Sequence, residues 1–194
     1  YPVQYEGEES SKNVFYTGAA PNQQAIPATD YYLDELGVKK FALLGTDYVY
    51  PRTTNKILKQ YLIDKGIPES DIFVNYTPFG HSDWSKIVSD VVSLGADGKK
   101  VGVISTINGD ANIGFYKELA AAGVKADDIP VVAFSVGEEE LSGLDTTNLV
   151  GHLAAWNYFQ SAESDLNTSF IKAWKSKMGD KRVTNDPMEA HVIG

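Results

Sequence analysis

The sequence contains no cysteine, which excludes a disulfide framework, a thiolate-bound metal and a cysteine nucleophile. It also lacks any run of the roughly 18 to 20 apolar residues that a membrane-spanning helix requires. Positive charge is scarce, since 17 Lys and Arg stand against 26 Asp and Glu and the formal net charge is -9. An acidic surface repels phosphate groups, so nucleic acids and anionic membrane surfaces are unfavourable partners.

The chain of 194 residues is long enough for one α/β domain with a core, or for one domain and part of another. Its content of 43% hydrophobic and 22% charged residues is typical of globular domains. The chain opens at Tyr1 without a basic segment followed by an apolar stretch. We therefore expect no signal peptide within it and regard it as a processed or excised piece.

Short apolar runs alternate along the chain with longer segments of helical periodicity. Residues 39–45 and 101–105 are apolar without alternation, which is typical of parallel strands buried on both faces. The other predicted strands are 14–16, 71–76, 130–134 and 148–153, and the predicted helices are 23–36, 53–65, 82–94, 112–122, 137–141, 162–178 and one from 186. This alternation predicts an α/β fold with a doubly wound, mostly parallel sheet and helices on both faces, as in flavodoxin-like domains.

Ligands of open parallel sheets bind beyond the carboxyl ends of the strands. The corresponding loops here are 45–52, 77–83, 106–110 and 135–138. The first loop carries Tyr48 and Tyr50, and the third carries Asn108-Gly109-Asp110 just before a predicted helix.

These residue types suit a small uncharged amide. Tyrosine provides a flat ring with a hydroxyl, and asparagine provides an amide that complements another amide. Arg52 is the one arginine in the four loops, whereas a phosphate or carboxylate ligand calls for a cluster of them.

Each of these residues also has a structural interpretation, which stays open. Tyr48 and Tyr50 could be ordinary surface aromatics, and Asn108-Gly109 is a common turn sequence. Asp47 and Asp110 could cap helices, as could Ser82 or Asp83. The tryptophans are expected to be packing residues: Trp84, Trp156 and Trp174.

Motifs of the common enzyme classes are absent from the sequence. It contains neither a G-x-S-x-G nucleophile elbow nor a G-x-x-x-x-G-K-[ST] phosphate loop. The histidines His81, His152 and His191 fall in unrelated segments without metal-ligand spacing. We therefore expect no catalysis, no metal and no cofactor.

Four segments of the sequence carry a resemblance: YPVQYEG at 1–7, YTGAAPNQ at 16–23, GTDYVYPR at 45–52 and STINGD at 105–110. They resemble the type I periplasmic binding proteins, in particular the urea-binding components of ABC transporters. They are more distantly similar to the amide-sensing regulators of bacterial amidase operons. The likeness covers essentially the whole chain. Its most specific element is the Asp-Tyr-x-Tyr-Pro-Arg block, whose tyrosine pair the wider branched-chain amino acid receptors lack.

The resemblance implies two lobes joined by three crossover strands, with the ligand in the cleft between them. Residues 1–12 would then be a remnant of the first lobe and its crossover, 13–153 the second lobe, and 154–194 the crossover and an incomplete return into the first lobe. The lobes would close on the solute by a hinge motion. The protein would lie in the periplasm, where a membrane permease would recognise the closed state. A missing first-lobe segment of the parent chain would be a further partner.

The resemblance also implies a set of ligand-binding residues. From the first lobe these are Tyr1, Val3 and Gln4, and from the second Tyr48, Tyr50, Asn108, Gly109 and Asp110. The amide regulator carries threonine in place of Val3 and valine in place of Asn108. Compared with that regulator, this chain has its polar side chain on the second-lobe wall of the cleft instead of the first-lobe wall. That exchange favours urea over an alkyl amide.

Three alternatives remain open at this point: an amide-sensing regulator, a branched-chain amino acid receptor of the same fold, and an enzyme on a flavodoxin-like domain. Because much of the first lobe would be missing, we expect these 194 residues to bind urea weakly or not at all.

Overall fold

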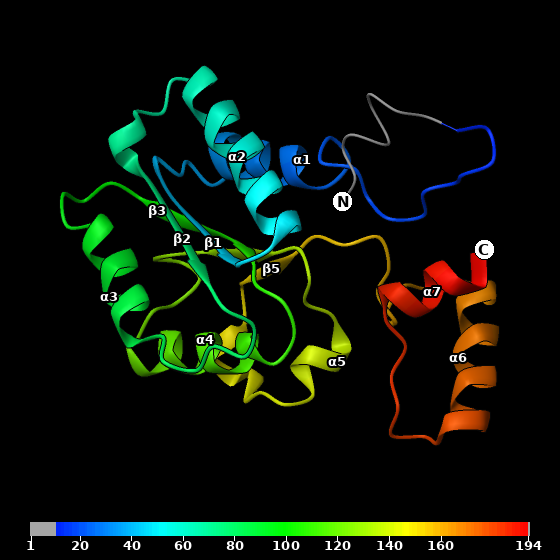
Figure 1. Ribbon diagram of the computed structural model, residues 1–194. Helices are drawn as coiled ribbons and strands as arrows, with labels where there is room; N and C mark the ends of the chain where they lie inside the picture. The colour runs from blue at the N-terminus through cyan, green and yellow to red at the C-terminus, as the bar shows by residue number, and fades with distance from the viewer. Residues whose placement is uncertain (1–10, 194) are drawn as a thin grey trace.

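A central parallel sheet between two layers of helices forms most of the molecule, as Figure 1 shows for the computed structural model, which describes residues 11–193. The strands are β1 (Lys40–Thr46), β2 (Ile72–Thr77), β3 (Val101–Thr106), β4 (Val131–Ala133) and β5 (Leu153–Ala154). They lie in the order β2-β1-β3-β4-β5, and every neighbouring pair is parallel. The predicted doubly wound α/β fold is confirmed.

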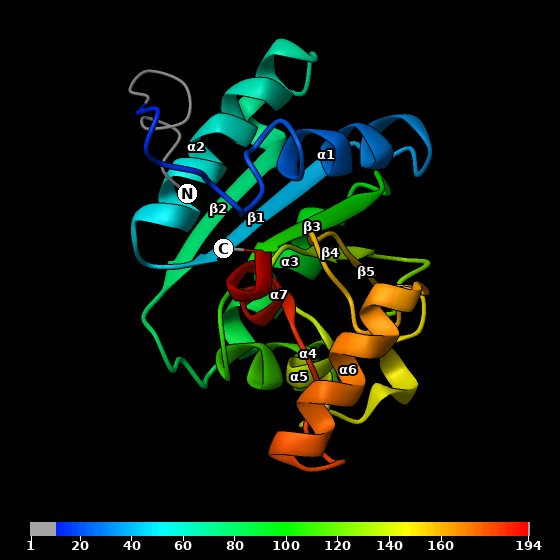
Figure 2. The ribbon, with the colours of Figure 1, turned by 90° about the vertical axis from the view of Figure 1, so that its right-hand side faces the viewer.

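Two helices cover each face of the sheet. Helices α1 (Ala25–Asp34) and α2 (Val49–Asp64) lie on one face, and α3 (Ser85–Leu94) and α4 (Ala111–Ala121) lie on the other (Figure 2). Shorter turns of helix complete the connections: η2 (Glu69–Asp71), α5 (Glu138–Leu141) and η3 (Thr146–Leu149).

The alternation of side chains along β1 explains why its sequence is apolar throughout. Phe41 and Leu43 enter the core that α1 and α2 complete, whereas Ala42 and Leu44 enter the core that α3 and α4 complete. All seven residues of β1 are buried as a result. A strand covered on both faces has no solvent-facing positions and therefore no polar alternation.

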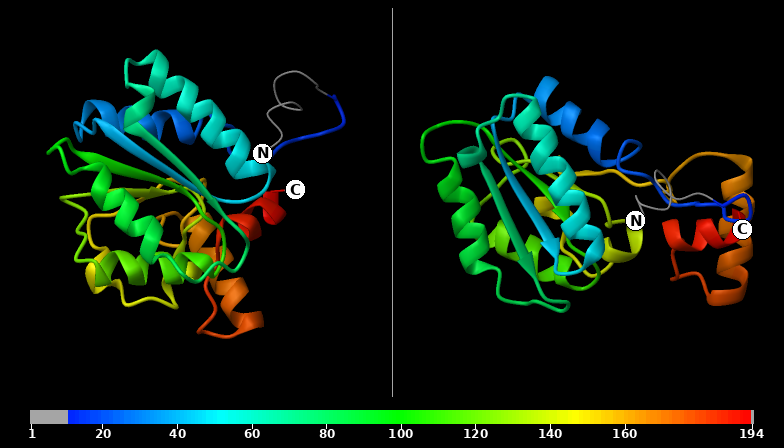
Figure 3. Two further views of the ribbon diagram at one scale, coloured as in Figure 1. Left: turned by 60° about the vertical axis from the view of Figure 1, so that its left-hand side comes forward. Right: turned by 45° about the horizontal axis from the view of Figure 1, so that its top comes forward.

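The last two helices stand apart from the sheet. Helix α6 (Asp165–Met178) and α7 (Asp186–Ile193) form a pair on the side toward which the carboxyl ends of the strands point, and an extended segment joins them to β5 (Figures 1 and 3). Among residues 11–193, no helix combines the length and the apolarity needed to cross a membrane.

Two predicted strands are wrong. Residues 14–16 form no strand, because the N–H of Val14 hydrogen-bonds locally to the carbonyl of Ser11 at 3.1 Å, and Phe15 is 88% exposed. Of residues 148–153, only Leu153 belongs to a strand. The preceding residues form a 3-10 turn, and Gly151, with φ of +95°, interrupts any extended backbone there.

The start of α2 also differs from the prediction. The helix begins at Val49 and not at Thr53, so Tyr50, Pro51 and Arg52 lie in its first turn. Pro51 is compatible with this position because the first N–H groups of a helix have no partner within it.

The N-cap residues of the helices also differ in part from the prediction. Trp84 is the N-cap of α3, and Asp83 instead accepts hydrogen bonds from the N–H and hydroxyl of Ser85. Tyr48, and not Asp47, is the N-cap of α2. Asp110 does occupy the N-cap position of α4, but its side chain makes no capping hydrogen bond.

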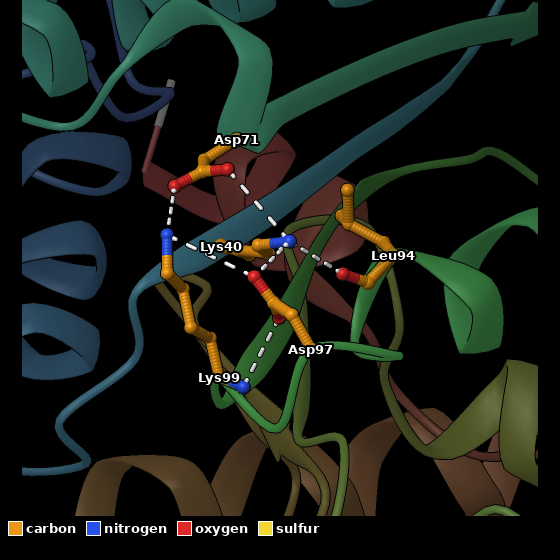
Figure 4. Close-up of polar contacts among 5 residues, drawn as sticks. All are labelled: Lys40, Asp71, Leu94, Asp97 and Lys99. Atoms are coloured by element: carbon orange, nitrogen blue, oxygen red, sulfur yellow. Dashed lines mark hydrogen bonds and ion pairs between the residues drawn. The ribbon is translucent and has the colours of Figure 1, made fainter.

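An ion-pair cluster holds the amino edge of the sheet, opposite to the carboxyl ends of the strands (Figure 4). Lys40 Nζ lies 2.9 Å from Asp97 Oδ2 and 3.7 Å from Asp71 Oδ1, and it donates to the carbonyl of Leu94 at 2.9 Å. Lys99 Nζ supplies Asp71 with a second cation at 2.9 Å. The cluster thus pairs two lysines with two aspartates and connects the starts of β1, β2 and β3.

Candidate ligand-binding site

The crevice between the carboxyl ends of β1 and β3 is the topological switch point of the sheet. From β1 the chain passes through α2 to β2 on one side, while β3 pairs with β1 on the other side. The loops that leave β1 and β3 therefore diverge, and the space between them is the common ligand position in open α/β sheets.

Hydrogen bonds between the two strand ends define this crevice. The backbone N–H of Asn108 donates to Oγ1 of Thr46 at 2.9 Å, and Oγ1 of Thr106 donates to the carbonyl of Leu44 at 3.1 Å. Both threonines are fully buried. The position of Asn108 is thus set by β1 as well as by its own strand.

Gly45 allows the first turn of α2 to lie against the strand ends. A Cβ at this position would come within 2.5 Å of Thr106 Oγ1 and 2.6 Å of Pro51 Cβ, distances that real side chains do not adopt. The absence of a side chain therefore brings the start of α2, with Tyr48 and Tyr50, to the mouth of the crevice.

A cavity of about 550 Å³ occupies this edge of the molecule. Its aromatic lining consists of Phe15, Tyr16, Tyr48, Tyr50, Phe134 and Trp156. Its polar lining consists of Thr17, Gln24, Asn108, Ser135, Asn157 and Asp186. Gly18, Ala19 and Val49 complete the wall. Three of the four loops expected to surround the ligand contribute lining residues. The described lining includes no residue of the loop 77–83, although the ring of Phe79 packs against that of Tyr48 with centroids 5.1 Å apart.

The structure brings three of the predicted residues together in this cavity: Tyr48, Tyr50 and Asn108. Gly109 and Asp110 are exposed and are not part of the lining. The chain turns at Gly109, where φ is +64°, and enters α4 away from the cavity. The other predicted residues, Tyr1, Val3 and Gln4, lie outside the described part of the chain.

Tyr48 and Asn108 form the polar centre of the cavity wall. The side chain of Asn108 donates from Nδ2 to the carbonyl of Thr106 at 3.1 Å. Burial raises the pKa of the Tyr48 hydroxyl, although the Asn108 side chain acts in the opposite direction. The hydroxyl therefore stays protonated at neutral pH and can both donate and accept. The rings of Tyr48 and Tyr50 meet edge to face, with centroids 6.0 Å apart.

Arg52 is held away from the cavity. Its Nε lies 2.5 Å from Oδ1 of Asp47, and its guanidinium stands 4.6 Å above the ring of Tyr76. The hydrogen bond from Arg52 lowers the pKa of the Asp47 carboxyl. The charges of Arg52 and Asp47 are therefore paired with each other within the protein.

Most of the lining residues were not foreseen as site residues, and three of them are Gln24, Trp156 and Asp186. The buried Gln24 donates from Nε2 to the carbonyls of Phe134 and Ala155, at 3.2 Å and 2.6 Å, and so joins α1 to the ends of β4 and β5. Trp156 was expected only to pack. Its ring lies against Gly137, 3.4 Å from the position that a Cβ of this glycine would occupy, which is an ordinary van der Waals distance. Asp186 reaches the cavity from α7. No local motif marks any of the three.

The chemistry that this lining offers is hydrogen bonding within aromatic walls. Within residues 11–193, no group of three or more histidine, aspartate or glutamate side chains is arranged to hold a metal ion. The cavity lining includes no histidine and no lysine among the residues that the structure describes.

Comparison with known proteins agrees with this architecture. A family described as the periplasmic binding protein domain matches residues 1–194. The chain belongs to that family.

Solved structures similar to this periplasmic binding protein domain show the same fold. A solute-binding protein of an ABC transporter from R. palustris, in complex with 4-hydroxybenzoate, is 21% identical, with a TM-score of 0.73 over 91% of this chain and 47% of its own. An ABC transporter substrate-binding protein from Sphaerobacter thermophilus is 19% identical, with a TM-score of 0.70 over 90% and 46%. A leucine-binding protein from Thermotoga maritima is 17% identical, with a TM-score of 0.63 over 89% and 48%.

The chain spans less than half the length of each of these three proteins. Identities at this level establish the shared fold and leave the ligand open.

Proposed function

We propose that this periplasmic binding protein domain captures a small uncharged polar solute, urea or a short amide, as part of the solute-binding component of an ABC importer. The observation that carries the proposal is the convergence of Tyr48, Tyr50 and Asn108 on one cavity at the switch point of the sheet.

The chemistry of these side chains matches that of urea. A planar solute can lie against the flat tyrosine and tryptophan rings that form the walls. The hydroxyl of Tyr48 can donate to the carbonyl oxygen of urea, and the amide oxygen of Asn108 can accept one of its N–H groups. The polar lining residues offer hydrogen bonds that a small polar solute can use over most of its surface, which supports urea over leucine.

We further propose that residues 13–153 form the second lobe of a two-lobed protein. Residues 1–12 and 154–194 would then be the crossovers and part of the first lobe, with Tyr1, Val3 and Gln4 facing the ligand from that side. The separation of the α6–α7 pair from the sheet supports this division (Figure 3). So does the length of the relatives, of which the part matched by this chain is less than half.

In this arrangement the two lobes close over the solute, and the closed state is what a permease recognises. The proposed compartment is the periplasm, and the proposed role is binding without catalysis.

Isothermal titration calorimetry on the longer parent protein tests the ligand, with urea, acetamide, formamide and leucine as the panel. Urea should bind most tightly and should also raise the melting temperature. Leucine binding more tightly than urea would contradict the proposal and favour a branched-chain amino acid receptor. Acetamide binding more tightly would favour an amide sensor. The 194-residue chain titrated in parallel should bind urea weakly or not at all, since we assign the other half of the cleft to the first lobe.

A further inference from the structure

The loop that follows β3 carries Asn108 and is held from two sides. From β1, Oγ1 of Thr46 accepts the N–H of Asn108 at 2.9 Å. From α4, Nδ2 of Asn112 donates to the carbonyl of Ile107 at 3.0 Å and to the carbonyl of Gly109 at 3.2 Å. These two carbonyls stand immediately before and after Asn108 in the chain. The side chain of Asn112 therefore bridges the backbone on either side of the amide that we propose binds the ligand.

Asn112 occupies a position where an apolar side chain would be expected. It is fully buried and lies on the face of α4 that contributes Phe115, Tyr116 and Leu119 to the core. The four positions follow the spacing of the buried stripe of a helix. The Oδ1 atom of Asn112 is buried without a hydrogen-bond partner within residues 11–193. Because such an atom costs free energy, stability alone does not explain an asparagine here.

The hydrogen bonds to the loop are what the asparagine adds. Both groups that face its side chain are carbonyls, which only accept, and an amide NH₂ group has two N–H donors to serve them. The carbonyl of Gly109 also accepts the backbone N–H of Asn112 at 3.1 Å. The turn between Asn108 and α4, where φ of Gly109 is +64°, is thus fixed from the helix.

We propose that Asn112 is a positioning residue of the ligand site: its amide holds the loop so that the side chain of Asn108 faces the solute. This inference rests on the proposed function, in which Asn108 accepts an N–H group of urea. Asn112 is not among the described residues that line the cavity. Its effect on binding therefore passes through the loop, as that of a supporting side chain behind a binding residue does.

A double-mutant cycle on the longer parent protein tests this role, with urea titrated in a calorimeter. The four proteins are the unmodified protein, Asn112→Leu, Asn108→Ala and the double variant. Leucine has the same branching as asparagine and suits the buried face of α4, so Asn112→Leu removes the hydrogen bonds to the loop without opening a cavity.

Thr29→Val is the matched control. It removes another fully buried hydrogen bond, from Oγ1 of Thr29 to the carbonyl of Ala25 at 2.8 Å. This bond lies in α1, which covers the opposite face of the sheet from α4 (Figure 2).

We expect Asn112→Leu to raise the Kd for urea by about fivefold to tenfold, because the loop no longer holds the Asn108 amide toward the solute. In the Asn108→Ala protein the same substitution should change the Kd by less than about twofold, because no amide remains to be positioned. Thr29→Val should leave the Kd unchanged. A purely structural role of Asn112 would instead give the same change with and without Asn108.

Hydrogen exchange measured by NMR without ligand gives an independent readout. The N–H of Asn108 is protected by its bond to Thr46, and the N–H of Val103 in β3 by a bond of 2.8 Å to the carbonyl of Pro130. Asn112→Leu should speed the exchange of the Asn108 N–H by about tenfold and leave that of Val103 unchanged. This measurement decides the question if Asn108→Ala binds urea too weakly to titrate.

A second variant serves if Asn112→Leu does not fold, as a melting curve would reveal. Asn112→Ser then replaces it in both measurements. A serine hydroxyl can donate to one carbonyl of the preceding turn, so the Kd for urea should rise by about twofold to threefold.

Three results would overturn the inference: an unchanged Kd for urea in the Asn112 variant, a change that is equal with and without Asn108, or unchanged exchange of the Asn108 N–H. Failure of the proposed function gives a different pattern. If acetamide or leucine binds more tightly than urea, the cycle is repeated with that solute. A change confined to the proteins that retain Asn108 then shows that the choice of urea is wrong and that the role of Asn112 stands. If none of these solutes binds, both are wrong.

Discussion

The backbone N–H of Asn108 donates a hydrogen bond to Oγ1 of Thr46 over 2.9 Å. This bond crosses from the loop after β3 to the last residue of β1, and Thr46 is fully buried. The buried hydroxyl of Thr46 therefore fixes the position of Asn108, the residue after β3 that we propose binds the ligand.

Thr46→Val removes this acceptor while preserving the shape of the side chain. It leaves the Asn108 N–H without its partner, so we expect the free energy of unfolding to fall by about 1 to 3 kcal/mol and urea binding to weaken. Differential scanning calorimetry and titration of the parent protein measure the two effects. Thr46→Ser keeps the hydroxyl and should retain most of the binding. Equal loss in both variants would show that the methyl group, and not the hydrogen bond, is what matters.

Tyr48→Phe separates the ring of the proposed site from its hydroxyl. The ring contacts with Tyr50 and Phe79 remain, so the melting temperature should change little. The Kd for urea should rise by about tenfold, the effect of one lost hydrogen bond to a ligand. Tyr31→Phe, on the exposed side of α1, is the matched control and should leave the Kd unchanged. An unaltered Kd in Tyr48→Phe would remove this hydroxyl from the site.

Gly45→Ala tests the close approach of α2 to the strand ends. The new methyl group would overlap Thr106 Oγ1 and Pro51, and the helix would have to shift. We expect a loss of about 1 to 3 kcal/mol in the free energy of unfolding, as is usual for overpacked cores. Gly18→Ala is the control, because no atom lies within 4 Å of a Cβ there. Equal melting temperatures for the two variants would show that Gly45 does not need its small size for α2 to approach the strand ends.

Lys40→Met tests the ion-pair cluster at the amino edge of the sheet (Figure 4). It deprives the buried Asp71 of one of its two cations, and we expect the free energy of unfolding to fall by about 1 to 3 kcal/mol. Lys86→Met, which breaks an exposed pair with Asp90, should cost less than about 0.5 kcal/mol. Thermal unfolding of the two variants measures the difference, and an equal effect would contradict a structural role for the cluster.

The same variant should also change the titration of Asp97. The hydrogen bond from Lys40 lowers the pKa of this carboxyl below its ordinary value of 3.8. A lowered folded-state pKa stabilises the protein above the unfolded-state value, and this contribution is lost as the pH falls below about 4. NMR titration of Lys40→Met should show the Asp97 pKa moving up toward its ordinary value.

His152 should make the stability depend on pH near neutrality. Its Nδ1 accepts a hydrogen bond from the N–H of Val131 at 3.1 Å, and burial lowers its pKa below the ordinary 6.5. The folded state thus binds this proton less readily than the unfolded state. The stabilising effect is complete above pH 6.5 and is lost as the pH falls through the lower folded-state pKa.

His152→Asn retains an acceptor but does not titrate. Between about pH 7.5 and about pH 5.5, its melting temperature should fall less than that of the unmodified protein. His191→Asn, at an exposed position on α7, should behave like the unmodified protein. A pH dependence that is unchanged in His152→Asn would show that other groups are responsible.

The order of strands and helices around the sheet could be predicted because it depends on local patterns. Residues 39–45 and 101–105 are apolar throughout, and the structure places β1 and β3 there with both faces covered. The predictions failed where a local turn competes with an extended backbone. The N–H of Val14 bonds within a turn, and Gly151 breaks the predicted last strand. Hydrophobicity alone does not distinguish these cases from true strands.

The tyrosine-rich loop after β1 and Asn108 after β3 could be proposed as site residues because parallel strands bring their carboxyl ends to one edge. The sequence by itself thus determined the α/β architecture and the meeting of Tyr48, Tyr50 and Asn108 at one edge of the sheet. Only the tertiary structure decided that Gln24, Trp156 and Asp186 share that cavity and that Gly109 and Asp110 do not. The physical reason is that such contacts join segments far apart in the chain. Periodicity and turn chemistry describe each segment separately, whereas the packing of α1, β5 and α7 around the sheet decides which side chains meet.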